Sequence, residues 1–218
     1  MMSEESLTRK DESKDFLLVE GPNDEHMFYS LLQYHQVPQR FKIEKKGGIN
    51  LLLDTLDVEL DRSGLNRLGI VVDANADLAT LWQSLRNRLT ELGYSSVPSN
   101  PLAEGTIIEQ DGRPVVGIWL MPDNTNPGML EDFVRLLLRQ GDVLWPIAED
   151  ALQKVITVEC RFRESYKSKA TLYTWLAWQE EPGKPIGQAI TANYLDSNAI
   201  HAQQLIQWIR KLFDLEAV

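Results

Sequence analysis

The feature that most constrains the fold of this chain is a strict alternation of short apolar runs with amphipathic segments between residues 16 and 93. A short run that is apolar on both faces is typical of a strand inside a parallel sheet. The continuous runs are Phe16–Val19 and Leu68–Val72, and between them a second strand alternates Phe41 and Ile43 with polar residues before a double glycine. The segments with helical spacing that follow these strands are 23–36, 49–60 and 78–93. Three strand–helix units in succession predict an α/β fold with a mostly parallel central sheet and right-handed crossovers.

The second half of the chain changes character. Two β-rich runs flank "QDGRP" between residues 105 and 123, and an Asp-Gly pair between apolar runs predicts an added β-hairpin. Beyond it, helical periodicity dominates, and Trp175, Trp178 and Trp208 fall on apolar faces, where we expect them to pack in the core. We therefore predict a polar, mobile tail over residues 1–14, an α/β core over 15–142, and a helical extension packed on that core over 143–218.

Composition indicates in which compartment the protein acts and which classes of partner it can bind. The single cysteine, Cys160, excludes an internal disulfide and a multi-cysteine zinc site, as expected of a cytoplasmic protein. No segment has the apolar character of a signal peptide or a membrane span, so no membrane partner is expected. The formal net charge of −10 opposes nonspecific binding to a phosphate backbone, although a bound cation would reverse the sign of the field locally.

Acidic and amide side chains follow several of the predicted strands. They are Glu20, Asp73, Asn75, Asp77 and Asp123. Ligands of open parallel sheets sit at the carboxyl ends of the strands, so these side chains would share one edge if the strands are neighbours. Carboxylates gathered there repel one another, and Mg²⁺ or Mn²⁺ would relieve that repulsion with oxygen ligands. The plainer alternatives are that Glu20 binds a nearby loop and that Asp77 is the N-cap of the next helix.

Two motifs in this arrangement carry a family resemblance. "LLVEGPNDEHMF", followed some fifty residues later by "LGIVVDANAD", resembles the Toprim domain of primases, topoisomerases and overcoming-lysogenization-defect nucleases. The whole-length pattern, with "MPDN", "GMLEDF" and "KSKATLYTWLAW", resembles a bacterial Toprim-like family of unknown function. The core resemblance covers about Asp15 to Asp132 and implies a Toprim-like three-layer fold.

The resemblance also implies roles for individual residues. Glu20 would be a general acid/base, and Asp73 would bind magnesium. Asn75 stands where the family has a second aspartate. The asparagine lacks the negative charge of that aspartate, so Asp77 would have to supply it. Asp123 would supply further metal ligation together with the acids of "GMLEDF", Glu131 and Asp132, whose alternative role is to face the positive end of a helix dipole.

Lysines supply the candidate cations. In the nuclease branch, a C-terminal lysine stabilises developing phosphate charge, and Lys169 or its neighbour Lys167 would take that role, unless both simply begin a solvated helix. Lys45 and Lys46 end the second predicted strand, where they would bind phosphate or pair with Glu20 or Asp73.

Two functional hypotheses follow. The first is a Mg²⁺-dependent (or Mn²⁺-dependent) protein acting on phosphodiesters of DNA or RNA, a nuclease ahead of a nucleotidyl transferase. The alternative is a noncatalytic Toprim-like module that binds a metal, a nucleotide, a protein partner or a second copy of itself. The second hypothesis rests on Asn75, on the net charge of −10 and on the absence of an attached helicase, zinc or ATPase domain.

Overall fold

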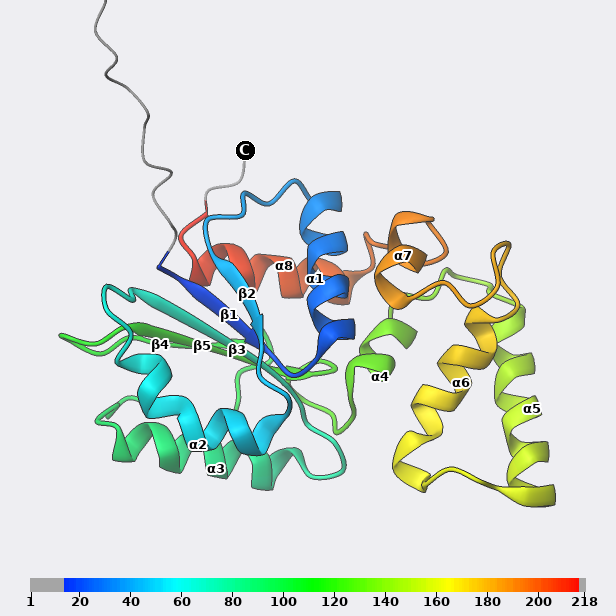
Figure 1. Cartoon of the computed structure of the whole chain (residues 1–218), viewed down its shortest axis with the longest axis horizontal. Coiled ribbons are helices and arrows are strands. Elements are labelled where there is room, and N and C mark those ends of the chain that lie inside the picture. Colours follow the sequence, from blue (N-terminus) through cyan, green and yellow to red (C-terminus); the bar gives the residue numbers. More distant parts are fainter. Residues whose placement is uncertain (1–13, 216–218) are drawn as a thin grey trace, which may run out of the picture.

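The computed structural model describes residues 14–215 and shows one five-stranded sheet covered by helices on both faces (Figure 1). The predicted tail over 1–14 lies outside the described residues apart from Lys14. The strands are β1 (Phe16–Val19), β2 (Lys42–Lys45), β3 (Arg67–Asp73), β4 (Thr106–Ile108) and β5 (Val115–Met121). The helices are α1 (Pro22–Tyr34), α2 (Ile49–Leu60), α3 (Leu78–Glu91), α4 (Leu130–Arg135), α5 (Leu144–Glu159), η1 (Glu164–Tyr166), α6 (Lys167–Leu176), α7 (Ile186–Thr191) and α8 (Ile200–Leu212).

The sheet has the mostly parallel topology that the alternation predicts. Its strand order is β2-β1-β3-β5-β4, in which β1, β2, β3 and β5 run parallel and β4 is an antiparallel edge strand. β4 and β5 form the predicted hairpin, with Ile108 opposite Val116. The α/β fold class with an added hairpin is thus confirmed, and β1 and β3 are direct neighbours at the centre.

Alternate side chains of the central strands pack in two separate hydrophobic cores, one on each face of the sheet. On one face, Leu18, Ile70 and Ile118 pack with the apolar sides of α2 and α3. On the other face, Leu17, Val71 and Trp119 pack with α1, α4 and the C-terminal helices. In Figure 1, α2 and α3 lie below the sheet and α1 and α8 above it. Every second residue of a strand points to the same face, so the continuous apolar strands serve both layers.

The C-terminal helices extend the upper layer. α8 lies so close to the sheet that a Cβ on Gly117 would come within 2.5 Å of Leu212, which explains a glycine inside a central strand. α5 and α6 project beside the sheet at the far end of the molecule (Figure 1). Trp175 and Trp208 are buried as predicted, but Trp178 is 41% exposed, because it follows the last turn of α6 rather than belonging to its apolar face.

Candidate functional site

The carboxyl ends of β1 and β3 bring two of the predicted site residues into contact. Glu20 directly follows β1, and Asp73 is the last residue of the neighbouring strand β3. The backbone N–H of Asp73 donates to Oε1 of Glu20 at 2.8 Å. Oδ1 of Asp73 in turn accepts the N–H of Leu130, at the start of α4, at 2.8 Å. Adjacent parallel strands therefore place both acids at one edge of the sheet, as the strand-end argument expects.

These acids line a cavity of about 370 Å³ at that edge. Its walls come from the loops after β1, β2 and β3 and from the first residues of α4 and α6. The polar side chains that line it are Glu20, Asn23, Asp24, Asp73, Asn75, Glu131, Tyr166 and Lys169. Gly48, with a φ of 115°, turns the chain after β2 so that its backbone passes beside Glu20.

Burial raises the pKa of three acids of this cavity, and repulsion between carboxylates adds to the effect for two of them. Desolvation and the nearby charges of Glu20 and Asp24 raise the pKa of Asp73 to about 8. Desolvation and the charge of Glu20 raise the pKa of Asp24 to about 7. Burial also raises the pKa of Glu20, opposed by the hydrogen bond from the Asp73 amide. The cavity therefore favours any species that neutralises negative charge, whether protons or a cation.

Asp24 is the site residue that sequence reasoning missed. The N-cap of α1 is Gly21, and Oδ2 of Asp24 accepts the Gly21 N–H at 3.1 Å. This contact holds Asp24 in the first turn of α1, beside Glu20 and 8% exposed. An acid four residues after a strand-end glutamate, at the third position of a helix, is the signal that could have identified it.

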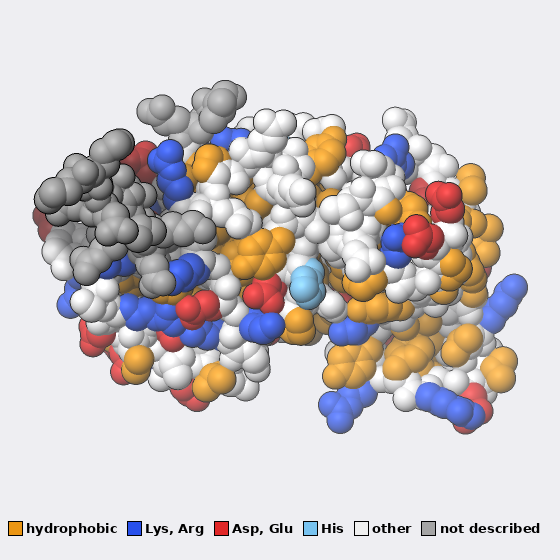
Figure 2. All heavy atoms as spheres, turned by 45° about the horizontal axis from the view of Figure 1, so that its top comes forward, with side chains coloured by type: hydrophobic (Ala, Val, Ile, Leu, Met, Phe, Trp, Pro, Cys, Tyr) orange, Lys and Arg blue, Asp and Glu red, His pale blue; other side chains and the backbone are white. Residues whose placement is uncertain are grey.

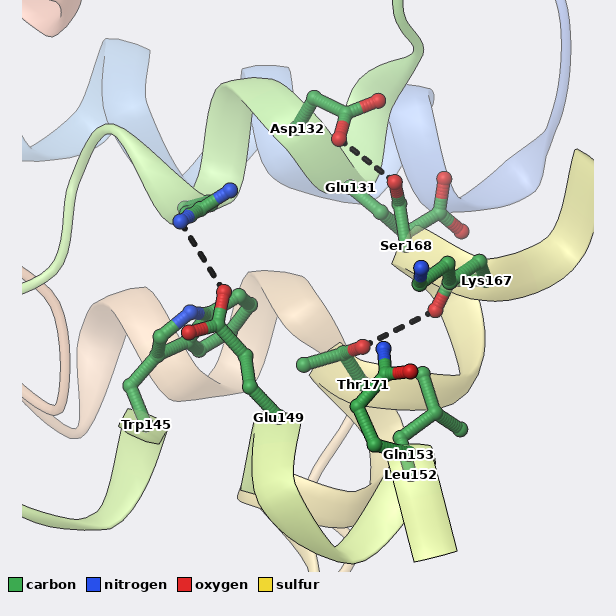
Figure 3. Close-up of a pocket in the computed structure, with 10 residues that line it drawn as sticks. Glu131, Asp132, Trp145, Glu149, Leu152, Gln153, Lys167, Ser168 and Thr171 are labelled. Carbon is green, nitrogen blue, oxygen red and sulfur yellow. Dashed lines mark hydrogen bonds and ion pairs between the residues drawn. The ribbon is translucent and has the colours of Figure 1, made fainter. Parts of the chain in front are cut away.

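Lys169 is placed at the cavity by α6. Its Nζ lies 3.5 Å from Oε1 of Glu131, a carboxylate with a side chain only 6% exposed. Among the described residues that line the cavity, Lys169 is the only cationic side chain. The neighbouring Ser168 donates to Oδ1 of Asp132 at 2.6 Å, a contact drawn in Figure 3. Two side-chain contacts thus attach the start of α6 to the start of α4 and hold Lys169 over the acids.

A second cavity, of about 380 Å³, lies on the other side of this attachment, between α4, α5 and α6 (Figure 3). It shares Glu131 with the first cavity and is also lined by Lys167. Its other acids already have partners, since Glu149 pairs with Arg135 at 3.0 Å and Asp132 accepts from Ser168 and from the Met129 N–H. It lies away from the strand ends, so we take the first cavity as the candidate site.

Asn75 lines the cavity, but its side-chain amide is engaged in a hydrogen bond to the backbone. Its φ of 52° is left-handed, a conformation that asparagine tolerates better than most residues. Its amide Nδ2 donates to the backbone carbonyl of Asp73 at 3.1 Å, and its N–H donates to Gly128 at 2.7 Å. In this arrangement Asn75 shapes the loop after β3.

Asp77 lies outside the cavity and is the N-cap of α3. This is the plainer of the two roles that the sequence suggested for it. Its Oδ1 accepts the Thr80 N–H at 2.9 Å and its Oδ2 accepts the Thr80 hydroxyl at 2.7 Å. These hydrogen bonds hold the pKa of Asp77 below its ordinary value. The carboxylate of Asp77 therefore stabilises the N-terminus of α3. It does not replace the negative charge that is missing at Asn75.

The capping geometry yields a prediction. Asp77→Ala should lower the midpoint temperature of unfolding by a few degrees, because two orphan donors lose their acceptor, while Asp77→Asn, which keeps a capping oxygen, should stay close to the wild type. Thermal unfolding followed by circular dichroism measures both. If instead both variants keep their stability and lose affinity for Mn²⁺, Asp77 is a metal ligand and the capping account is wrong.

The remaining candidates are likewise engaged outside the cavity. Asp123 accepts hydrogen bonds from Thr125 and Asn126 within its own loop. Lys45 pairs with Glu25 of α1 at 3.0 Å, and Lys46 pairs with Glu59 of α2 at 2.8 Å. The structure thus brings together Glu20, Asp73, Asn75 and Lys169, and it places Asp77, Asp123, Lys45 and Lys46 elsewhere.

Two broader properties of the described residues bear on the site. Between residues 14 and 215, no three histidine, cysteine or acidic side chains stand close enough to hold a metal ion by themselves. In the same part of the chain, no helix combines the length and the apolar character that crossing a bilayer requires.

Comparison with known proteins places the chain in a family without assigning a reaction. No curated protein and no solved structure matches it. The model of a family of proteins of unknown function (DUF3226) matches the chain over residues 14–214. It covers the sheet, the cavity and all the helices described above. The chain therefore belongs to the DUF3226 family of proteins of unknown function.

Proposed function

We propose that this protein is a Mg²⁺- or Mn²⁺-dependent, Toprim-like enzyme that cleaves phosphodiesters at the cavity beside β1 and β3. The observation that carries the proposal is the gathering of Glu20, Asp24, Asp73 and Glu131 around one cavity. Burial raises the pKa of the first three, and repulsion from neighbouring carboxylates raises the pKa of Asp24 and Asp73 further. Such clustering is typical of functional sites. The resemblance of "LLVEG" and "LGIVVD" to the Toprim motifs supports the same reaction class.

The donor set fits a hard divalent cation. All the candidate ligands are oxygens, and magnesium is usually held by one or two carboxylates, with water and substrate phosphates completing the octahedron. Asp73 and Glu20 would provide those carboxylates, so no ready-made group of three acids is required. When bound, the cation would polarise a phosphoryl oxygen and stabilise the leaving oxygen.

The side chains around the cavity have separable tasks. Glu20 is suited to take and return a proton, because burial raises its pKa above the ordinary value of a glutamate. Lys169 faces the acids from the opposite wall and would pair with a non-bridging phosphate oxygen. Because the net charge is −10, a nucleic acid, whether DNA or RNA, would need the cation to bind at all.

A cleavage assay tests the proposal. The full chain is incubated with single- and double-stranded DNA and RNA in the presence of Mg²⁺ or Mn²⁺, beside Asp73→Asn and a control, Asp54→Asn, which removes an exposed acid of α2. We expect cleavage by the wild type and the control, and loss of cleavage in Asp73→Asn. No cleavage of any substrate above the level of Asp73→Asn would refute the proposal.

One observation favours the noncatalytic alternative, a module that binds a metal, a nucleotide or a protein partner. Glu20 and Asp73 each already accept a backbone N–H, and Asn75 donates to a backbone carbonyl instead of supplying a second carboxylate. Calorimetry with Mg²⁺, Mn²⁺ and nucleotides separates the two functions. Binding without turnover would support the module, whereas binding followed by cleavage would exclude it.

A further inference from the structure

The segment from the end of α5 to the start of α6 is basic, although the chain as a whole is acidic. Residues 154–169 carry a surplus of three positive charges, against a formal net charge of −10 for the full chain. Figure 2 shows lysine and arginine side chains at the lower right end of the molecule, where Figure 1 places the turn between α5 and α6. We call residues 154–169 the basic tip. Its charged residues are Lys154, Arg161, Arg163, Lys167 and Lys169, against Glu159 and Glu164.

The cations of the basic tip are available to an anionic ligand. Arg163 is exposed and forms no ion pair with any other residue between 14 and 215. Arg161 pairs with Glu159 at 3.1 Å, and both side chains are exposed. Lys167 comes no closer than 4.0 Å to its partner. Exposed ion pairs of this kind are weak, so a phosphate backbone that approaches this otherwise acidic molecule is attracted here.

An aromatic ring connects the basic tip with the candidate cavity. Tyr166 lines that cavity together with Lys169, and Tyr166 is 48% exposed. Its N–H donates to the carbonyl of Arg163 at 2.8 Å, which closes the turn of η1 and links the two residues. Within the described part of the chain, the Tyr166 side chain neither stacks on another ring nor forms a hydrogen bond. An exposed tyrosine ring close to cations is typical of a surface that stacks on an unpaired nucleobase.

The position of α6 keeps this ring and Lys169 at the cavity. Residues 166, 169 and 173 follow helical spacing and share one side of α6. The hydroxyl of Tyr173 accepts a hydrogen bond from Nδ2 of Asn23, a cavity residue in the first turn of α1, at 3.0 Å. The same side of α6 therefore presents a ring for a base and an ammonium group for a phosphate to one ligand.

We infer that Tyr166 and the basic tip bind single-stranded nucleic acid and lead it to the cavity, with a base stacked on Tyr166 and a phosphate beside Lys169. The inference rests on the proposed function, since it names the strand that the cavity would cut. Both parts are needed: the cation in the cavity neutralises the acids, and the tip attracts the strand beyond the cavity.

The depth of the cavity favours a single strand over a duplex. Its volume of about 370 Å³ is near the lower end of the range for ligand pockets, about 300–1,000 Å³. Two of its acids lie deep, since Asp24 is 8% exposed and Glu131 5%. The bases of a duplex are already stacked and paired, so a duplex would have to open before one of its bases could reach Tyr166.

The distribution of charge favours a strand over a membrane. A flat anionic membrane would face a broad side of an acidic molecule, and the repulsion would act over a Debye length of about 8 Å. A single strand is narrow, so it can contact the basic tip and the cavity while the acidic remainder of the surface stays in solvent.

Fluorescence anisotropy with labelled oligonucleotides tests the inference. The Glu20→Gln chain is used in Mg²⁺, so that the strand is bound without being consumed. The probes are single-stranded DNA and RNA of about 12 nucleotides and the matching duplexes. Single strands should bind at least about tenfold more tightly than duplexes, because a duplex must first be opened. Tyr166→Ala should weaken single-strand binding about tenfold, whereas Tyr166→Phe, which keeps the ring, should retain the affinity.

Tyr29→Ala is the matched control for the ring. Tyr29 is a 39%-exposed tyrosine of α1 that does not line the cavity, so its loss should leave the affinity unchanged. The inference is overturned if duplexes bind as tightly as single strands, if Tyr166→Ala keeps the full affinity, or if Tyr29→Ala loses as much affinity as Tyr166→Ala.

The salt dependence of binding tests the basic tip. For single strands, the logarithm of the binding constant falls with the logarithm of the salt concentration by about 0.7 per phosphate contact, so Arg163→Ala should reduce this slope by about 0.7. Arg113→Ala is the control, because it removes an exposed arginine from the β4–β5 hairpin at the opposite end of the molecule (Figure 1). Equal slopes for the two variants would exclude the basic tip from the binding surface.

Vesicle binding separates a strand from a membrane as the ligand. The same variants are sedimented with vesicles of phosphatidylcholine and phosphatidylserine, and we expect no binding of the wild type. If the wild type binds these vesicles, and Arg163→Ala and Tyr166→Ala abolish that binding but leave strand affinity unchanged, the basic tip is a membrane surface and the inference is wrong.

Cleavage assays distinguish a failure of this inference from a failure of the proposed function. A wild type that cuts duplexes as fast as single strands, with rates unaffected by Tyr166→Ala, would refute the inference and leave the proposed enzyme standing. A wild type that binds single strands through Tyr166 without cutting them would refute the proposed enzyme and retain the single strand as the ligand of the cavity.

Discussion

Replacing Asp73 with asparagine should make the protein more stable at alkaline pH, although it alters the centre of the candidate site. The pKa of Asp73 is about 8 in the folded chain, against 3.8 as its ordinary value. Above pH 8 the wild type must keep this buried carboxylate charged beside Glu20 and Asp24. Asparagine removes that charge and retains Oδ1 as acceptor for the Leu130 N–H.

The sign of the pH dependence follows from proton linkage. Between pH 4 and pH 8 the folded wild type binds a proton at Asp73 that the unfolded chain has released, so the free energy of unfolding falls as the pH rises. We expect Asp73→Asn to match the wild type near pH 4 and to exceed it by about 2–4 kcal/mol at pH 8, since one pKa unit corresponds to about 1.4 kcal/mol and the coupled acids share the protons.

Urea unfolding at several pH values measures this difference. Asp54→Asn, on the surface of α2, is the control and should show no such divergence. Addition of Mn²⁺ at pH 8 should narrow the gap by stabilising the wild type alone, because a ligand stabilises the state that binds it. If Asp73→Asn is less stable than the wild type at pH 8, the charged carboxylate of Asp73 stabilises the fold. The site then carries no excess negative charge.

Replacing Glu20 with glutamine should abolish most of the catalysis without harming the fold. Glutamine keeps Oε1, which accepts the Asp73 N–H, but it cannot exchange a proton. Loss of a general acid/base lowers the rate by about 10²–10⁴-fold. The free energy of unfolding should be unchanged or higher, because burial raises the pKa of Glu20 and the neutral side chain avoids that penalty.

Steady-state cleavage rates, measured on the substrate that the wild type cuts best, provide the readout for Glu20. The wild-type rate should depend on pH through a group titrating above the ordinary range of glutamate, and the residual activity of Glu20→Gln should lose that dependence. A Glu20→Gln enzyme with wild-type rate and an unaltered pH profile would remove Glu20 from the proton-transfer role.

The parts of the fold that the sequence predicts are those with strong local signals. The strand–helix units and the Asp-Gly hairpin have periodicity or turn chemistry that needs no tertiary information. α7 was missed, because its six residues include Gly187 and its existence depends on packing. A Cβ at Gly187 would lie 2.7 Å from the carbonyl of His26 in α1. α4 ends at Arg135, and turns follow it although the apolar residues of "LLL" continue the segment.

For the candidate site, topology was predictable and side-chain direction was not. Parallel strands bring Glu20 and Asp73 to one edge whatever their side chains do. Where an acid points depends on competing local hydrogen bonds: Asp77 caps a helix, Asp123 closes its own turn, and Asp24 is turned toward the cavity by Gly21. Such short-range contacts of aspartate compete with ligand binding at each position and are decided only in the folded loop.

The most direct test of the central claim, that this cavity holds a divalent cation for phosphodiester chemistry, is anomalous diffraction from crystals of the full chain soaked in Mn²⁺ at pH 8. We predict an anomalous peak within coordinating distance of carboxylate oxygens of Asp73 and Glu20, and its loss in crystals of Asp73→Asn. An ordered cavity without any peak, with Glu20 and Asp73 still bonded to the Asp73 and Leu130 amides, would contradict the claim.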